Sequence, residues 1–173
     1  MSKMPLDKIT VKDIVDDCDI SRNTFYYNYQ DIYAVIEQLF ETELNSILDS
    51  QSVHQSWRQV FTDICVFLHE YKSAVYSMYN SSRRDFVEGQ IKQLVYVCVS
   101  QTVESTAREL GAAQCDMDTV VQFYSYAVDG FINAWIGSSM SESIESLTLR
   151  VGSVLEDSLK HVLKTSLDNF STD

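Results

Sequence analysis

Apolar side chains recur along most of this chain every three to four residues, which is the period of amphipathic helices. Two short stretches near the N-terminus are each preceded by a hydroxyl residue, Thr10 or Ser21, that can cap a helix. Between them the period breaks at Asp19 and Ile20. The pattern therefore predicts two short helices around a tight turn, with Ile20, Phe25 and Tyr29 facing inward.

Longer stretches with the same period fill the rest of the chain, and no strand-like alternation interrupts them. The expected helices cover about 31–49, 54–71, 72–80, 84–110, 116–138 and 143–167. Gly111 follows one of them, where glycine commonly ends a helix. The predicted fold class is all-α, with an N-terminal helix-turn-helix headpiece and a C-terminal helical bundle.

The segment from Ile9 to Asp31, with its Ile-Ser pair and its Thr-Phe-Tyr-Tyr run, resembles the DNA-binding signature of the TetR family of bacterial transcriptional regulators. The resemblance implies a DNA-binding headpiece and linking helix over 1–48, and an effector-binding and dimerisation domain over 49–173. It further implies a regulator that binds a double-stranded DNA operator as a homodimer, as a repressor released by a small ligand. The alternative is a TetR-like co-regulator or ligand-sensing interaction protein that no longer binds DNA directly.

A short polar and aromatic helix after a capped turn is typical of the helix that enters a DNA major groove. The candidate DNA-binding residues are Thr10, Ser21, Arg22, Asn23, Thr24, Tyr26, Tyr27 and Asn28. The resemblance favours Tyr26 for a phosphate contact, and Arg22, Asn23 and Tyr27 for contacts in the groove. The alternative for each tyrosine is partial burial against the next helix.

Charge argues against tight DNA binding. The net charge is −12, and residues 1–30 hold four basic side chains against five acidic ones, whereas sequence-independent DNA affinity comes from Lys and Arg. Ile32 and Gln30 occupy positions that are often basic in TetR-like chains. Most of the family's first helix also has no counterpart before Ile9, so the resemblance implies a loosely held headpiece. These features favour the interaction-protein alternative.

The two C-terminal helices carry the most apolar sequence of the chain. Apolar side chains cover more than half of the circumference of the helix expected at 116–138. A helix that packs only against its own chain needs a narrower apolar face. The resemblance implies that the last two helices pair with those of a second copy. The candidate dimer-interface residues are Tyr124, Val128, Phe131, Trp135, Leu155 and Leu159. The alternative is a central helix of a monomeric bundle.

Aromatic residues gather in the middle helices, where the resemblance implies a cavity for an unknown small-molecule effector. The candidate lining residues are Trp57, Phe61, Tyr79, Phe123 and Tyr126. Aromatic residues repeated at the helical period more often belong to the hydrophobic core than to a ligand cavity. No catalytic motif, metal-ligand spacing or glycine-rich phosphate loop is found, so we expect no enzyme, no cofactor and no metal.

Four widely spaced cysteines without a C-x-x-C pair indicate structural thiols rather than disulfides. Apolar residues make up 45% of the chain without a run long enough to span a membrane. The N-terminal sequence lacks the charged-then-apolar order of a secretory signal. We therefore expect a cytoplasmic protein with no membrane partner.

Overall fold

The computed structural model describes residues 8–50, 57–111 and 117–170. Within these ranges the chain forms eight helices and no strand, which confirms the predicted all-α class. The helices are α1 (Val11–Asp17), α2 (Arg22–Asn28), α3 (Ile32–Ser50), α4 (Trp57–Glu70), α5 (Lys72–Tyr79), α6 (Arg84–Leu110), α7 (Met117–Gly137) and α8 (Ile144–Phe170). None of these described helices has the length and apolar composition needed to cross a bilayer.

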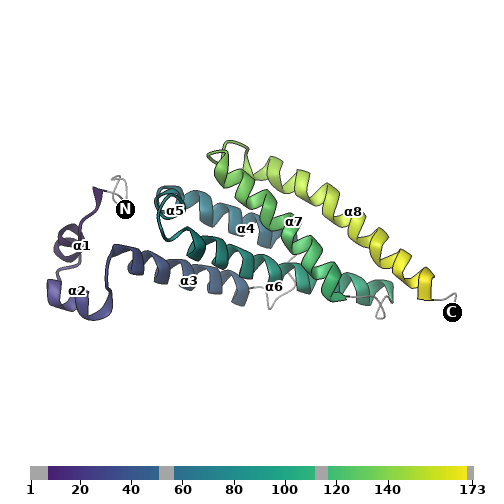
Figure 1. Cartoon of the computed structure of the whole chain (residues 1–173), viewed down its shortest axis with the longest axis horizontal. Coiled ribbons are helices and arrows are strands. Elements are labelled where there is room, and N and C mark those ends of the chain that lie inside the picture. The colour runs from purple at the N-terminus through teal and green to yellow at the C-terminus, as the bar shows by residue number, and fades with distance from the viewer. Residues whose placement is uncertain (1–7, 51–56, 112–116, 171–173) are drawn as a thin grey trace.

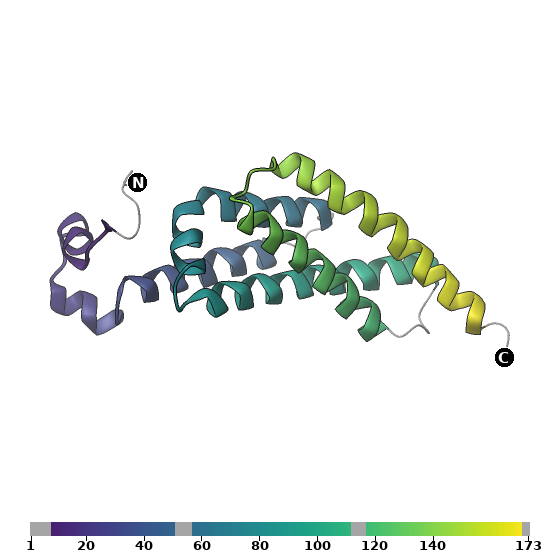
Figure 2. The same cartoon turned by 45° about the horizontal axis from the view of Figure 1, so that its top comes forward.

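The molecule is elongated, with α1 and α2 at one end and the C-terminal half of α8 at the other (Figure 1). The helix α3 leads from this headpiece into the bundle, where it packs on α4 and α6. The centre of the bundle is α6, which contacts α3, α4, α5, α7 and α8. Figure 2 shows α7 and α8 together on one side of the bundle, which leaves both helices with an outward face.

Local signals set several helix ends as predicted. Thr10 Oγ1 accepts from the Asp13 N–H at 3.2 Å, and Asp13 Oδ2 accepts from the Thr10 N–H at 2.8 Å, which is a capping box. Ser21 Oγ accepts from the Thr24 N–H at 3.0 Å and caps α2. Gly111 adopts a φ of 71° and ends α6. These helix boundaries therefore follow from the chain's own sequence.

The prediction that Ile20 faces inward is wrong, because 40% of this side chain remains exposed. It follows Asp19, whose φ of 52° turns the chain between α1 and α2. Phe25 is buried as predicted and, together with Val15, forms the small core of the headpiece. The helix starts expected near residues 54 and 116 lie outside the described residues.

The bundle encloses a continuous apolar core. Its largest fully buried side chains are Phe40, Ile64, Leu68, Met78, Ile91, Leu94, Ile132, Ile136, Leu147 and Leu163. At the rim, Glu156 accepts from Trp57 Nε1 at 2.8 Å and from both Nε and Nη2 of Arg58, which joins α8 to α4. Burial of apolar surface supplies most of the stabilisation of the bundle, and the polar contacts fix the positions of its helices.

Candidate functional site

The helix α2 lies at the end of the molecule (Figure 1), and its polar and aromatic side chains are exposed to solvent. Tyr27 is 90% exposed and Tyr26 is 58% exposed, so neither is buried against α3. Arg22 and Asn23 are exposed on the same helix. Across the described part of the chain, the side chains of Arg22, Asn23 and Tyr27 make no hydrogen bond or ion pair. Their polar groups are therefore available to a partner.

The other four predicted DNA-binding residues use polar groups within the headpiece. Thr10 Oγ1 donates to a carboxylate oxygen of its capping-box partner at 2.6 Å. The hydroxyls of Ser21 and Thr24 lie 2.9 Å apart and share a hydrogen bond. Asn28 Nδ2 donates to the Thr24 carbonyl oxygen at 2.9 Å. These side chains are exposed, and they hold the shape of the turn that positions α2.

The electrostatic environment of the headpiece is weakly acidic. Its described residues 8–29 hold three basic and four acidic side chains. The pKa of Asp13 lies below its ordinary value because the Thr10 hydroxyl donates to the carboxylate, so this charge persists at lower pH. Ile32 packs against the apolar core of the bundle, which explains an apolar residue at this position, and Gln30 is exposed. Within α2, Arg22 is the one basic residue.

Five of the six residues predicted for the dimer interface are buried within this one chain. They are Tyr124, Val128, Trp135, Leu155 and Leu159, with exposed fractions between 2% and 6%. Four of them line a central cavity with residues of α4 and α6, so they face inward. Only Phe131 is partly exposed. The sequence did not reveal this orientation because α7 is apolar on more than one side.

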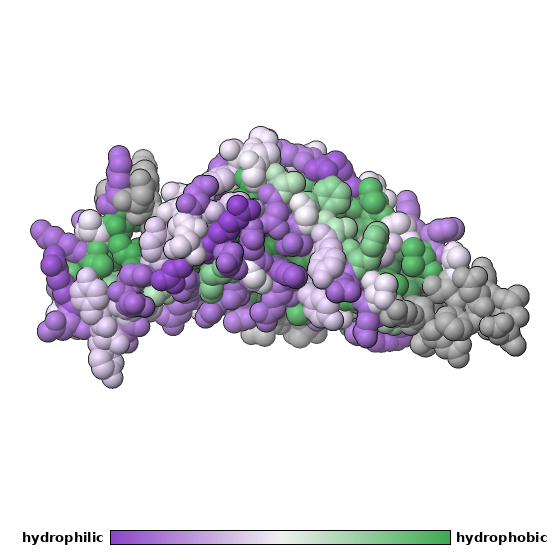
Figure 3. All heavy atoms as spheres, viewed as in Figure 1, coloured by the Kyte–Doolittle hydropathy of each residue, from purple (hydrophilic) through white to green (hydrophobic). Residues whose placement is uncertain are grey.

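A different apolar face of α7 and α8 is open to solvent, and Figure 3 shows apolar surface on this side of the bundle. Phe123 is 65% exposed on α7, while Val154 and Val162 are 59% and 37% exposed on α8. The Arg150 guanidinium lies 5.1 Å from the centre of the Phe131 ring, so the outward sides of the two helices adjoin. This exposed apolar face of α7 and α8 is available to contact helices of another molecule.

The five residues predicted to line an effector pocket do not come together. Trp57 and Phe61 line the central cavity, which is apolar and measures about 20 Å³, enough for one water molecule. Tyr79 lies elsewhere, and its hydroxyl donates to Asn133 Oδ1 at 3.2 Å. Phe123 is on the outer face, and Tyr126 lines a separate groove between α6 and α7. The central cavity as it stands has no room for an organic effector.

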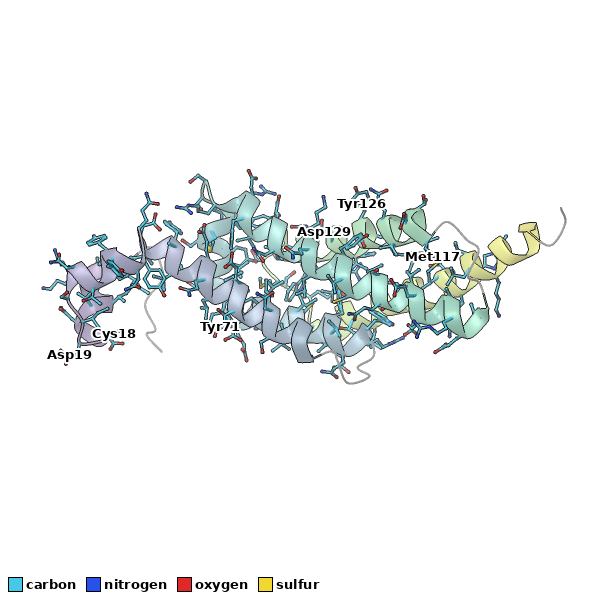
Figure 4. The ribbon with its side chains drawn as sticks, turned by 90° about the horizontal axis from the view of Figure 1, so that it is seen from below. Cys18, Asp19, Tyr71, Met117, Tyr126 and Asp129 are labelled. Atoms are coloured by element: carbon cyan, nitrogen blue, oxygen red, sulfur yellow. The ribbon has the colours of Figure 1, made fainter. Side chains whose placement is uncertain are left out.

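The groove between α6 and α7 is open and measures about 460 Å³. Its lining residues are Gly89, Lys92, Gln93, Tyr96, Gln122, Ser125 and Tyr126. Figure 4 labels Tyr126 and, one turn further along α7, Asp129. Burial raises the pKa of Asp129, and its Oδ1 has no hydrogen-bond partner within the described chain. Of these lining residues, only Tyr126 is among those predicted from the sequence. The four-residue spacing of Lys92 and Tyr96, which places both on one side of a helix, is the sequence feature that indicates the groove.

The described cysteines differ in their exposure to solvent. Cys65 is buried, and burial raises its pKa to about 12, so the thiol stays protonated. Cys18 is exposed on the headpiece, and Cys115 lies outside the described residues. Among the described side chains, no group of three or more His, Cys, Asp or Glu residues is placed to hold a metal ion.

A comparison with protein families supports the resemblance from an independent part of the chain. A TetR-type family model, described as a transcriptional regulator C-terminal region, matches residues 55–157, more than half of the sequence. A search of curated proteins finds no match. The matched region includes α4 to α7 and part of α8, whereas the DNA-binding signature is confined to the headpiece. The chain therefore belongs to the TetR family of transcriptional regulators.

Proposed function

We propose that this regulator binds operator DNA as a homodimer through α2 and is released by a small ligand, acting as a repressor. The supporting observation is the exposure of Arg22, Asn23, Tyr26 and Tyr27 on a capped helix at the end of the molecule. In this assignment, residues 1–48 form the DNA-binding part and 49–173 the effector-binding and dimerisation part.

The chemistry of these side chains suits a DNA major groove. An arginine guanidinium donates two parallel hydrogen bonds to the edge of a guanine, and an asparagine amide pairs with adenine. A tyrosine hydroxyl donates to phosphate oxygens and fixes the orientation of the helix. Arg22 and Asn23 therefore read bases in our proposal, and Tyr26 and Tyr27 position α2 against the backbone and the groove wall.

Dimerisation in this proposal uses the outward face of α7 and α8, with Phe123 and Phe131 on one helix and Val154 and Val162 on the other. Each pair is spaced by eight residues, which keeps both members on one side of a helix. An added Cβ at Gly130 would meet no atom within 4 Å, so a partner helix can approach closely there. Two copies joined in this way present two headpieces to the two half-sites of an operator.

The dimer face is tested with Val154→Glu, which places a charge on the proposed interface without entering the core. The matched control is Leu149→Glu, an equally exposed apolar position on α8. The two positions are five residues apart and so point to different sides of the helix. We expect Val154→Glu alone to give a monomer in sedimentation equilibrium, with unchanged helicity. A dimer that survives Val154→Glu would exclude this face.

DNA binding is tested by fluorescence anisotropy with the DNA flanking the gene, at two salt concentrations. Tyr26→Ala is expected to weaken binding by about tenfold, as for the loss of one good contact. Arg22→Ala is expected to weaken binding by about tenfold or more and to relax the base preference at one position of the operator. Leu149→Ala removes an exposed apolar side chain of the bundle and serves as the control. Unchanged binding by the α2 variants would exclude docking through this helix.

Two observations favour a second candidate, a TetR-like co-regulator or ligand-sensing interaction protein that does not contact DNA directly. The described headpiece has more acidic than basic side chains, and Ile32 packs into the core where a phosphate-binding lysine is common in the family. The same titration separates the two candidates. A folded dimer that binds no flanking DNA at low salt supports the co-regulator.

A further inference from the structure

The groove between α6 and α7 offers the space that the central cavity lacks. The groove measures about 460 Å³ against about 20 Å³ for the cavity. Pockets for small organic ligands commonly measure about 300 to 1,000 Å³. The groove lies on the side of α7 that faces α6, so it is distinct from the outward face that adjoins α8.

The wall of this groove contains a buried hydroxyl without a partner. Ser125 is 4% exposed, and its Oγ makes no hydrogen bond within the described chain. Buried side-chain polar atoms are hydrogen-bonded in the large majority of cases, so an unpaired one calls for a donor or acceptor from outside. Ser125 lines the groove, but its Oγ is buried, so a ligand reaches this atom only when the side chain rotates toward the groove.

Lys92 is the charged residue of the groove lining, which otherwise contains neutral hydrogen-bonding side chains, tyrosine rings and a glycine. Its Nζ lies 5.4 Å from the centre of the Tyr126 ring and forms no ion pair in the described chain. By contrast, four arginines of the bundle are each paired with a carboxylate: Arg58, Arg83, Arg84 and Arg150. Lys92 is therefore the one cation of the groove lining in a chain of net charge −12, and the carboxyl near enough to interact with it is that of Asp129, whose charged form is disfavoured by burial.

The rings of Tyr96 and Tyr126 supply the apolar part of the groove, and both are about half exposed. The Tyr126 hydroxyl accepts from Gln122 Nε2 at 3.0 Å, which fixes its direction on α7. A ligand with a flat ring can lie against these faces in place of solvent. Its polar group then meets the ammonium and the hydroxyl at the same site.

We propose that the groove binds a small aromatic carboxylate, with the carboxylate accepting from Lys92 Nζ and Ser125 Oγ and the ring packed against Tyr96 and Tyr126. An ammonium and a hydroxyl both donate to a carboxylate, and a charge-assisted hydrogen bond is stronger than a neutral one. An organic cation would meet the like charge of Lys92. The groove therefore selects an acid over the corresponding neutral or cationic compound.

The test is isothermal titration calorimetry of the whole chain with benzoate and, as the uncharged analogue of the same shape, benzamide. We expect benzoate to bind at least about tenfold more tightly than benzamide, as for one charge-assisted contact. Lys92→Gln should weaken benzoate binding by about tenfold and leave benzamide unaffected. Ser125→Ala should weaken benzoate binding by a smaller factor. Lys164→Gln, an exposed lysine of α8, is the control.

Three results would overturn the proposal: no binding of benzoate, equal binding of benzoate and benzamide, or equal benzoate affinity in the wild type and Lys92→Gln. Lys92 is exposed, so its replacement does not disturb the core, and circular dichroism checks this. An effect of benzoate on DNA affinity rests additionally on the proposed function. Lys92-dependent benzoate binding by a chain that binds no DNA would refute the proposed function alone, while DNA binding without benzoate binding would refute the groove alone.

Discussion

The headpiece and the bundle are stabilised in different ways. Among the described residues of the headpiece, α1 and α2 bury only Val15 and Phe25, and their ends are held by hydrogen bonds between residues three or four apart. The bundle buries a continuous core drawn from α3 to α8. Regions with little buried apolar surface open at a lower free energy than the core does. The comparison indicates that the headpiece is stabilised mainly by local hydrogen bonds, whereas the bundle is stabilised by packing between helices.

The two regions also differ in whether their arginines form ion pairs. Arg58 in the bundle pairs with Glu156, and Arg83 pairs with Glu37 at 2.6 Å and with Asp31 at 3.2 Å. Arg22 in the headpiece has no such partner in the described chain. A paired arginine positions helices, whereas an unpaired, exposed one is available to phosphates or bases. This difference is consistent with a structural role in the bundle and a binding role in the headpiece.

The largest effect is expected when a buried phenylalanine of the bundle is replaced by alanine. The same replacement in the headpiece then compares the two regions. Phe40→Ala removes a ring that is 0% exposed in the bundle and lies 5.0 Å from the Phe67 ring. We expect it to lower the free energy of unfolding by about 3–5 kcal/mol through lost burial and a cavity. Urea denaturation followed by tryptophan fluorescence measures this, because both tryptophans, Trp57 and Trp135, lie in the bundle.

Phe25→Ala is the matched change in the headpiece, where the ring is 2% exposed. We expect it to leave the tryptophan-detected transition unchanged and to increase amide exchange throughout α1 and α2. The local core has few other buried side chains, so its loss opens the headpiece without reaching the bundle. A fall in the tryptophan-detected midpoint equal to that of Phe40→Ala would mean that the two regions unfold as one unit.

A smaller effect is expected from the helix cap. Ser21→Ala removes the hydroxyl that accepts from the Thr24 N–H, and should destabilise α2 by about 1 kcal/mol. Hydrogen exchange of the α2 amides measures the loss, and Ser153→Ala, at an exposed position within α8, provides the control. Exchange in α2 that is as slow as in the wild type would show that packing, rather than the cap, holds this helix.

The smallest effect concerns the ion pair at the rim of the bundle. Hydrogen bonds from Arg58 and Trp57 hold the pKa of Glu156 at about 2, below its ordinary value of 4.5. A carboxyl with a lowered folded-state pKa stabilises the protein above its unfolded-state pKa and loses this contribution as the pH falls toward the folded-state value. Solvent screening limits the contribution to below about 1 kcal/mol, since both charged side chains are more than one third exposed.

We therefore expect Glu156→Gln to lower the free energy of unfolding near neutral pH, with a difference from the wild type that shrinks between about pH 4.5 and pH 2. Denaturation curves across this range measure the difference. Asp157→Asn, at the exposed neighbouring position, controls for a change of net charge. A difference independent of pH would show that the contribution of Glu156 does not depend on its charge.

The local elements of this protein follow from its sequence. Thr10 and Ser21 cap α1 and α2, Gly111 ends α6, and the exposure of Tyr26 and Tyr27 agrees with the polar side predicted for α2. Each of these features depends on residues within one or two helical turns, so a single segment contains the information. The family signature lies in the same kind of segment, and the match of 55–157 supports it from the bundle.

The directions in which the α7 side chains point, and the positions and sizes of the cavities, depend on the tertiary structure alone. The sequence of α7 is apolar on more than one side, so it did not reveal that Tyr124 and Val128 face the core while Phe123 faces solvent. The central cavity is small because side chains from several helices fill it, and the groove with Lys92 and Ser125 exists because two helices distant in sequence meet there. Which side of an apolar helix is covered depends on its neighbours, and those are set by the packing of the whole chain.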